Sequence, residues 1–179
     1  MLHRTDTDDT MNTTRARRLA VLGVAIVLAL VLVGLLATHT GFLPVTTGEY
    51  EERTLHVTDC ADTQRAQLTV AVAESSDQQY VGLSRTDSLG PDEGMLFPYG
   101  SEGSREIEMR NMDFGLDVIY VGSDGEITGI TTLDAPDSAV EYYLTYDSTT
   151  GVGQYVLEVN AGWSAANGVS AGDCVTGLP

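Results

Sequence analysis

The sequence predicts a mainly-β domain, built as a small β-sandwich or a partly closed β-barrel with two short helices, preceded by one transmembrane helix. Three observations support this prediction. Short alternating apolar runs recur after residue 53, no long helical period interrupts them, and residues 19–37 carry no charge. The absence of long crossover helices argues against an α/β fold. A chain of 179 residues has room for one domain with a sizeable core.

The N-terminal part of the chain divides into three segments. Residues 1–18 are polar and without periodicity, so we expect a disordered tail. As a helix, residues 19–37 would span about 28 Å, close to the hydrocarbon thickness of a bilayer. Residues 38–53 read as an acidic linker that contains the helix-ending Pro44. Residues 54–179 remain as the β domain.

The charges around the apolar stretch predict an orientation. Arg15, Arg17 and Arg18 precede it, and no arginine follows closely on its far side. By the positive-inside rule the tail is cytoplasmic and the β domain extracytoplasmic. The stretch is longer than the apolar core of a signal peptide, which favours an uncleaved anchor over a cleaved signal. We therefore expect a single-pass protein of the cell membrane, with residues 19–37 as its contact with lipid.

The charge balance limits the partners. There are 26 acidic residues against 9 basic ones, all arginine, for a net charge of -17. Such a surface repels nucleic acid phosphates, so we expect no nucleic acid partner. The acidic residues are scattered along the chain, which favours adaptation to concentrated salt over a surface that binds basic partners. In such salt the repulsion between these charges is screened, because the Debye length is about 3 Å at 1 M.

The two cysteines, Cys60 and Cys174, lie near the two ends of the β domain. In an exported domain an even pair predicts a disulfide, and two buried thiols are the alternative. The bond would close a loop of more than 100 residues, worth about 4–5 kcal/mol in the chain-entropy model. Two cysteines alone do not make a zinc site, and no glycine loop of the phosphate-binding type is present. We expect neither a metal nor a cofactor.

The elements of the β domain follow from alternation and turn chemistry. Alternating or short apolar runs predict strands at residues 54–58, 67–73, 95–97, 105–109, 116–121, 126–133, 154–160 and 172–176. The residues Ser75-Ser76-Asp77 offer an N-cap for a helix over about residues 77–84, and a helical turn over 163–167 ends at Gly168. Asp124-Gly125 predicts a hairpin. Residues 134–153 are polar and read as an irregular excursion with one edge strand.

Several short motifs follow one another along this domain. They are GL-x-R at Gly82, Leu83 and Arg85, D-x-GMLF from Asp92 to Phe97, M-[KR]-N at Met109, Arg110 and Asn111, LD-x-[IL] from Leu116 to Ile119, LE-x-NAG from Leu157 to Gly162, and G-[DN] at Gly172 and Asp173. In this order they resemble the conserved bacterial and archaeal family known as domain of unknown function 192, over about residues 66–177. The resemblance implies a mainly-β domain, often exported or membrane-tethered, with no established activity. We expect a salt-adapted, haloarchaeal-like, membrane-anchored member.

This chain departs from the family pattern at two places of interest. Ser84 stands where the family usually has methionine. Ile107 and Glu108 stand where it usually has Phe-Trp. The lost tryptophan weakens any expectation of aromatic stacking at that position.

The motif residues supply the candidate site. The ligand-binding candidates are Arg85, Met109, Arg110, Asn111, Asp117 and Glu158. The arginines could fork onto a carboxylate or sugar hydroxyls, with Asp117 and Asn111 completing a polar lining. Alternatively, Arg110 pairs with Asp117 or Glu158 for structural reasons alone.

The leading hypothesis is an anchored extracytoplasmic domain that binds a small polar ligand, glycan or envelope component near Arg85, Arg110 and Asp117, without catalysis. One alternative is a weak carboxylate hydrolase that uses Asp117 and Glu158, with carboxyls about 5–10 Å apart and one raised pKa. The other is a docking module with an exposed apolar patch of several hundred Å² and no pocket. The oligomeric state and the ligand stay open.

Overall fold

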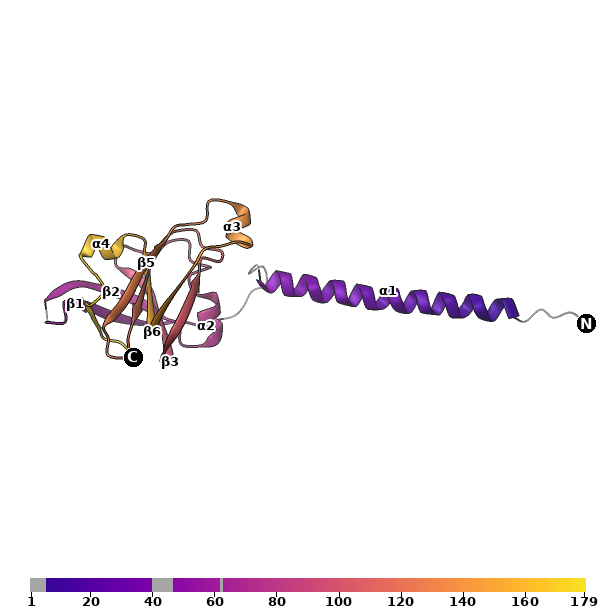
Figure 1. Cartoon of the computed structure of the whole chain (residues 1–179), viewed down its shortest axis with the longest axis horizontal. Coiled ribbons are helices and arrows are strands. Elements are labelled where there is room, and N and C mark those ends of the chain that lie inside the picture. The colour runs from indigo at the N-terminus through magenta and orange to yellow at the C-terminus, as the bar shows by residue number, and fades with distance from the viewer. Residues whose placement is uncertain (1–5, 40–46, 62) are drawn as a thin grey trace, which may run out of the picture. The chain divides into compact units, whose positions relative to one another are not determined.

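The computed structural model describes residues 6–39, 47–61 and 63–179. The chain forms two compact units, Met1–Pro44 and Val45–Pro179. The first contains the helix α1 (Asp6–His39), and the second contains the seven described strands and three short helices, α2 (Ser76–Val81), α3 (Ala139–Tyr143) and α4 (Trp163–Asn167) (Figure 1).

The helix α1 is longer than the apolar stretch that predicts it. It begins at Asp6, so residues 6–18, which we expected to be disordered, are helical. A helix already formed over residues 19–37 extends into its neighbours at little cost, because nucleation is the expensive step. Residues 1–5 of the predicted tail, and residues 40–46 of the predicted linker with Pro44, lie outside the described residues.

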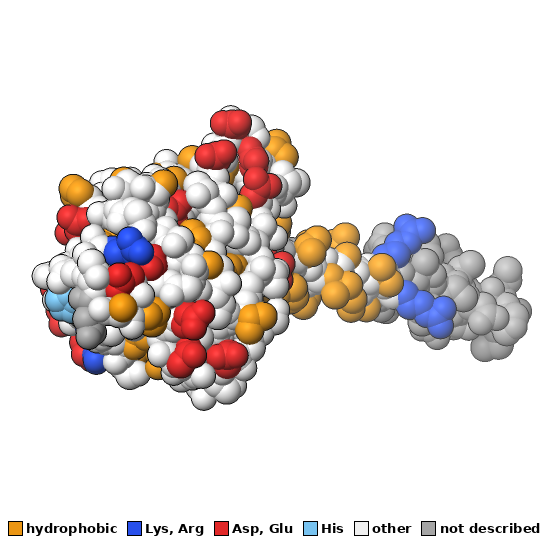
Figure 2. Space-filling view, turned by 60° about the vertical axis from the view of Figure 1, so that its left-hand side comes forward, with side chains coloured by type: hydrophobic (Ala, Val, Ile, Leu, Met, Phe, Trp, Pro, Cys, Tyr) orange, Lys and Arg blue, Asp and Glu red, His pale blue; other side chains and the backbone are white. Residues whose placement is uncertain are grey.

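The segment Arg17–Ala37 of α1 is long and apolar enough to cross a membrane, with a mean hydropathy of 3.2. Its visible surface is covered by hydrophobic side chains (Figure 2). This assignment uses the length and composition of the helix alone, and an N-terminal signal sequence passes the same test.

The seven strands form one sheet in the order β5-β4-β6-β3-β2-β1-β7. They are β1 (Glu51–Thr58), β2 (Gln64–Val72), β3 (Glu93–Glu108), β4 (Leu116–Val121), β5 (Ile127–Leu133), β6 (Ser148–Asn160) and β7 (Cys174–Thr176). Every neighbouring pair is antiparallel except β2 and β3, which are parallel and joined through α2.

The two ends of the sheet approach each other without forming a continuous ladder. Glu126 and Cys174 make an isolated bridge, and the Ile127 N–H donates to the Asp173 carbonyl at 2.8 Å. The predicted disulfide between Cys60 and Cys174 is present in the same region. The sheet is therefore a partly closed barrel, which confirms the predicted fold class.

Four element predictions need correction. The runs 95–97 and 105–109 belong to the single strand β3, because a long β6 pairs with both halves across a register shift between Pro98 and Gly103. Residues 148–153, expected to be irregular, are the first part of β6. The strand β1 begins at Glu51, inside the predicted linker, and α3 is a third short helix.

The alternation of the strands separates two apolar clusters. The first takes buried side chains from all seven strands and fills the barrel, with Leu55, Leu96 and Leu157 fully buried. The second lies on the other face of β3, β4 and β6 and includes Met95, Val118 and residues of the connecting segments. On β4, Ile119 faces the first cluster while its neighbours face the second.

Candidate functional site

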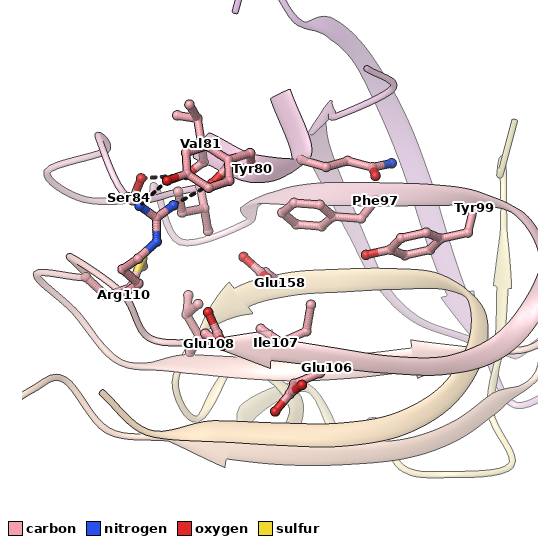
Figure 3. Close-up of a pocket in the computed structure, with 15 residues that line it drawn as sticks. Tyr80, Val81, Ser84, Phe97, Tyr99, Glu106, Ile107, Glu108, Arg110 and Glu158 are labelled. Carbon is pink, nitrogen blue, oxygen red and sulfur yellow. Dashed lines mark hydrogen bonds between the residues drawn. The ribbon is translucent and has the colours of Figure 1, made fainter. Parts of the chain in front are cut away.

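A cavity of about 240 Å³ opens on the face of the sheet that carries the second cluster. Its wall is formed by α2 and the chain that follows it, and by β3, the start of β4 and β6 (Figure 3). The residues that line this cavity include three glutamates, Glu106, Glu108 and Glu158, and three aromatic residues, Tyr80, Phe97 and Tyr99.

Glu158 lies near the C-terminal end of β6, opposite Met95 of β3 and Val118 of β4. Its side chain is 5 % exposed and points into the space between Phe97 and the Ile107–Glu108 stretch of β3 (Figure 3). Within residues 47–61 and 63–179, no group donates a hydrogen bond to its carboxyl. Burial raises the pKa of Glu158 from its ordinary 4.5 to about 8, so the carboxyl is mainly protonated at neutral pH.

Arg110 packs on α2. Its guanidinium carbon lies 4.3 Å from the centroid of the Tyr80 ring. Its Nη2 donates to the Tyr80 carbonyl at 2.7 Å, and its Nη1 to the Tyr80 hydroxyl at 3.3 Å. The guanidinium of Arg110 is therefore held against Tyr80 in the wall of the cavity.

A second stack of the same kind lies along β3. The guanidinium of Arg105 is 4.0 Å from the centroid of the Tyr99 ring, and its nitrogens donate to the Gly153 and Ser101 carbonyls. Burial, followed by the charge of Glu158, raises the pKa of Tyr99. Tyr99 and Glu158 therefore affect each other electrostatically.

Asp117 has a structural role on the opposite face of the sheet. Its carboxylate accepts from the Thr132 hydroxyl at 2.7 Å and from the backbone N–H groups of Gly162 at 3.0 Å and Ser164 at 2.8 Å. Burial alone would raise the pKa of Asp117, but these hydrogen bonds outweigh it and hold the pKa below its ordinary value. The side chain ties β4 to β5 and to the start of α4.

The pairing of Asp117 with Glu158 that the hydrolase hypothesis needs is not formed. In the register of β4 and β6, Val118 is opposite Glu158 and Asp117 is opposite Val159. Because successive side chains of a strand point to opposite faces, the two carboxyls lie on different sides of the sheet.

The motif at residues 109–111 has three separate local roles. Met109 is fully buried in the second cluster. Arg110 stacks as described, and Asn111 takes a left-handed conformation with φ of 56°, which asparagine tolerates better than most residues. The Asn111 N–H donates to the Tyr142 carbonyl at 3.1 Å, and the side chain is 9 % exposed.

The structure does not bring Arg85, Arg110 and Asp117 into one cleft. Arg85 is exposed and lines a second cavity of about 340 Å³, together with Glu52 and Glu93. Asp117 borders a third, shallower hollow beside α4. Of the six predicted residues, the first cavity holds Arg110 and Glu158.

Sequence reasoning missed most of the lining. The alternation of residues 105–110 places Glu106 and Glu108 on one face of a strand, which was a usable signal. Nothing local indicated that α2 would cover this face, or that Tyr80 and Tyr99 would each carry an arginine. Among the described residues, no three His, Cys, Asp or Glu side chains group as a metal site would require.

Comparisons with known proteins show what the β domain is similar to. The family model described as DUF192, an uncharacterized ACR, matches residues 57–177. A crystal structure of a candidate transcription regulator from Sinorhizobium meliloti 1021 is 30 % identical, with a TM-score of 0.63, covering 72 % of this chain and 95 % of that one. A protein of unknown function from Novosphingobium aromaticivorans DSM 12444 is also 30 % identical, with a TM-score of 0.55, covering 68 % and 82 %. No curated protein matches.

Proposed function

Because this chain belongs to the DUF192 family, which is described as uncharacterized, we propose its function from the site itself: the β domain binds a small polar ligand in the cavity beneath α2, with Glu158 at its floor. The observation that carries this proposal is a carboxyl that is 5 % exposed, faces a cavity and receives no hydrogen bond from the described chain. A buried polar group without a partner lowers stability, so such groups are concentrated at functional sites.

Glu158 differs in this respect from four other polar residues of the family motifs. Asp92 accepts from the Trp163 indole at 3.2 Å, and Asn160 donates to the Gly90 carbonyl at 2.9 Å. Asp173 pairs with Arg65 at 2.9 Å, while Asp117 holds α4. Each of these four side chains joins two parts of the fold. The Glu158 carboxyl makes no such connection and faces the cavity instead.

The test is a search for small molecules that co-purify with the full chain, held in a polyoxyethylene detergent that carries neither sugar nor charge. Wild type is compared with Glu158→Leu, whose apolar side chain suits the neighbouring Met95 and Val118. Glu126→Gln, at an exposed glutamate outside the lining, is the control. We expect a compound that wild type and the control retain and Glu158→Leu loses. Identical retention by all three proteins would refute the proposal.

A carboxylate hydrolase is the second candidate, favoured by the raised pKa of Glu158 and by Glu106 and Glu108 in the same lining. Prolonged incubation separates the two functions, because an enzyme would convert the retained compound and Glu158→Gln would stop the conversion.

The cavity also counts against the docking alternative, which required no pocket. We do not propose for this chain the transcription-regulator role named for the Sinorhizobium structure, because a net charge of -17 repels nucleic acid phosphates.

We further propose that α1 anchors the β domain outside the cell membrane and that the acidic surface is an adaptation to high salt. Support comes from the apolar segment Arg17–Ala37, from the arginines at its N-terminal side, and from the acidic groups spread over the visible face of the domain (Figure 2). Protease added outside intact cells should digest the β domain while an N-terminal tag stays protected. Digestion of the tag instead would reverse the orientation.

A further inference from the structure

We infer that the ligand of this cavity is a small organic ammonium ion, paired with the Glu158 carboxylate and flanked by Phe97 and Tyr99. The inference rests on the proposed ligand-binding function and names its ligand class. Three features of the cavity lead to it: the balance of charge in the lining, the aromatic walls and the size of the space.

The charge of the lining favours a cation. The lining contains three glutamates, the buried Glu158 and the exposed Glu106 and Glu108, and one arginine, Arg110. A second guanidinium, that of Arg105, is stacked on Tyr99 beside the cavity, so carboxyl groups outnumber guanidinium groups here by three to two. Acidic residues in a concave site of low dielectric concentrate the negative potential, and the whole chain adds to it with a net charge of -17. An anionic ligand would meet repulsion from the same groups.

The aromatic residues favour an organic cation over a metal ion. The faces of tyrosine and phenylalanine rings carry partial negative charge and attract ammonium and guanidinium groups. Two cations of this domain already use that attraction beside the cavity, Arg105 over Tyr99 at 4.0 Å and Arg110 over Tyr80 at 4.3 Å. Phe97 is 97 % buried and offers no hydrogen bond, so a hydrated metal ion would gain nothing from it, whereas alkyl groups on nitrogen would pack against it.

Glu158 then has a partner only when the ligand is bound. In the empty cavity the carboxyl is buried and keeps its proton. When the ammonium ion enters, the carboxyl releases this proton to the buffer, and the resulting carboxylate pairs with the positive charge. A volume of about 240 Å³ lies just below the range of about 300–1,000 Å³ typical of sites for drug-sized ligands, which limits the ion to a few carbon atoms.

The proton release makes binding depend on pH. Other charged or titratable groups around this region are Tyr80 on α2, Tyr99, Arg105, Glu106 and Glu108 on β3, Arg110 after β3, and Tyr120 on β4. Because the pKa of Glu158 is about 8, the fraction of ionised carboxyl falls about 100-fold from pH 9 to pH 6. The affinity for a permanently charged ion should fall by the same factor.

The experiment is calorimetric titration of the full chain with choline at pH 6, 7, 8 and 9, in the polyoxyethylene detergent and at one NaCl concentration. The neutral isostere 3,3-dimethyl-1-butanol, which replaces the nitrogen by carbon, controls for shape. Glu158→Gln tests the proposed counter-ion, and Glu126→Gln controls for the loss of one acidic charge elsewhere.

We expect choline to bind about 100-fold more tightly at pH 9 than at pH 6, and the isostere to bind weakly at every pH. Glu158→Gln should weaken choline binding at pH 9 by about 30-fold and remove the pH dependence. A phosphocholine detergent distinguishes two sources of the ion: competition with free choline identifies a lipid headgroup as the ligand, and no competition identifies a free solute.

The inference is overturned if the isostere binds as well as choline, or if wild type and Glu158→Gln bind choline alike. It also fails if choline and tetramethylammonium do not bind at all. In that case a retained neutral compound lost from Glu158→Leu would leave the proposed ligand-binding function intact. The absence of any such compound would remove both.

Discussion

Replacing Glu158 by glutamine should change how the stability of the β domain depends on pH. Glutamine keeps the shape of the side chain and removes its ability to ionise. In wild type, the pKa of this carboxyl is about 8 in the folded state, against an ordinary value of 4.5 that applies to the unfolded chain. The folded protein therefore holds a proton that the unfolded chain releases, and the stabilising contribution, complete below pH 4.5, is lost as pH rises to about 8.

The size of the effect follows from these two values. Between pH 5 and pH 9 the free energy of unfolding of wild type should fall by about 4 kcal/mol because of this one group. Such a change is a large fraction of the stability of an ordinary domain, which is about 5–15 kcal/mol. Glu158→Gln should lack this component, so the variant should gain on wild type as pH rises.

The assay is denaturant unfolding of the full chain in detergent, without added ligand, at several pH values between 5 and 9. Trp163 is the single tryptophan and is 5 % exposed, so its fluorescence reports the unfolding of the β domain alone. Glu126→Gln, an exposed site, should follow wild type. Parallel curves for wild type and Glu158→Gln would show that the carboxyl is not held protonated in the cavity, and the reasoning would be wrong.

Four further predictions concern the fold and the surface. Asp117→Asn should lower the free energy of unfolding by about 3 kcal/mol, because an amide nitrogen would face donors of α4; a change below about 1 kcal/mol in the same denaturant assay would contradict its anchoring role. Replacing Cys60 and Cys174 by serine should cost about 5 kcal/mol by opening a loop of 114 residues, and equal denaturation midpoints with and without the bond would argue against this. Arg110→Ala should cost no more than about 1 kcal/mol and should tighten choline binding, since it removes a cation from the lining; unfolding, or weaker binding by calorimetry, would be the contrary result. The melting temperature should fall when salt is reduced from about 3 M to about 0.1 M, whereas a flat dependence would speak against salt adaptation.

The candidate site was predicted only in part, and single residues show why. Glu158 was named because it belongs to a motif, and its position at the floor of a cavity was not foreseeable from its neighbours Leu157 and Val159. Asp117 belongs to a motif of equal quality and has a structural role instead. Both carboxyls interrupt apolar strands, and the difference between them is the face of the sheet to which each points. That face depends on the pairing of β4 with β6, which no local pattern encodes.

The length of β3 and β6 was missed for a related reason. Residues 148–153 are polar and glycine-containing, and in isolation they read as a loop. They are a strand because Gly103 to Glu108 pair with them over six consecutive positions. Backbone pairing with a partner outweighs weak local propensity.

The sequence by itself determined the class of the fold, the family, the strand over residues 116–121 and the two cysteines of the disulfide. Each of these depends on local alternation, on motif order or on the number of cysteines. The tertiary structure alone decided that α2 lies over one face of β3 and β6, that two arginines stack on tyrosines there, and that Glu158 is buried without a partner in the described chain. Apart from the stack of Arg105 on Tyr99 within β3, these features arise between residues about 30 to 80 positions apart along the chain, where burial and contact are set by register and packing rather than by the order of neighbouring residues.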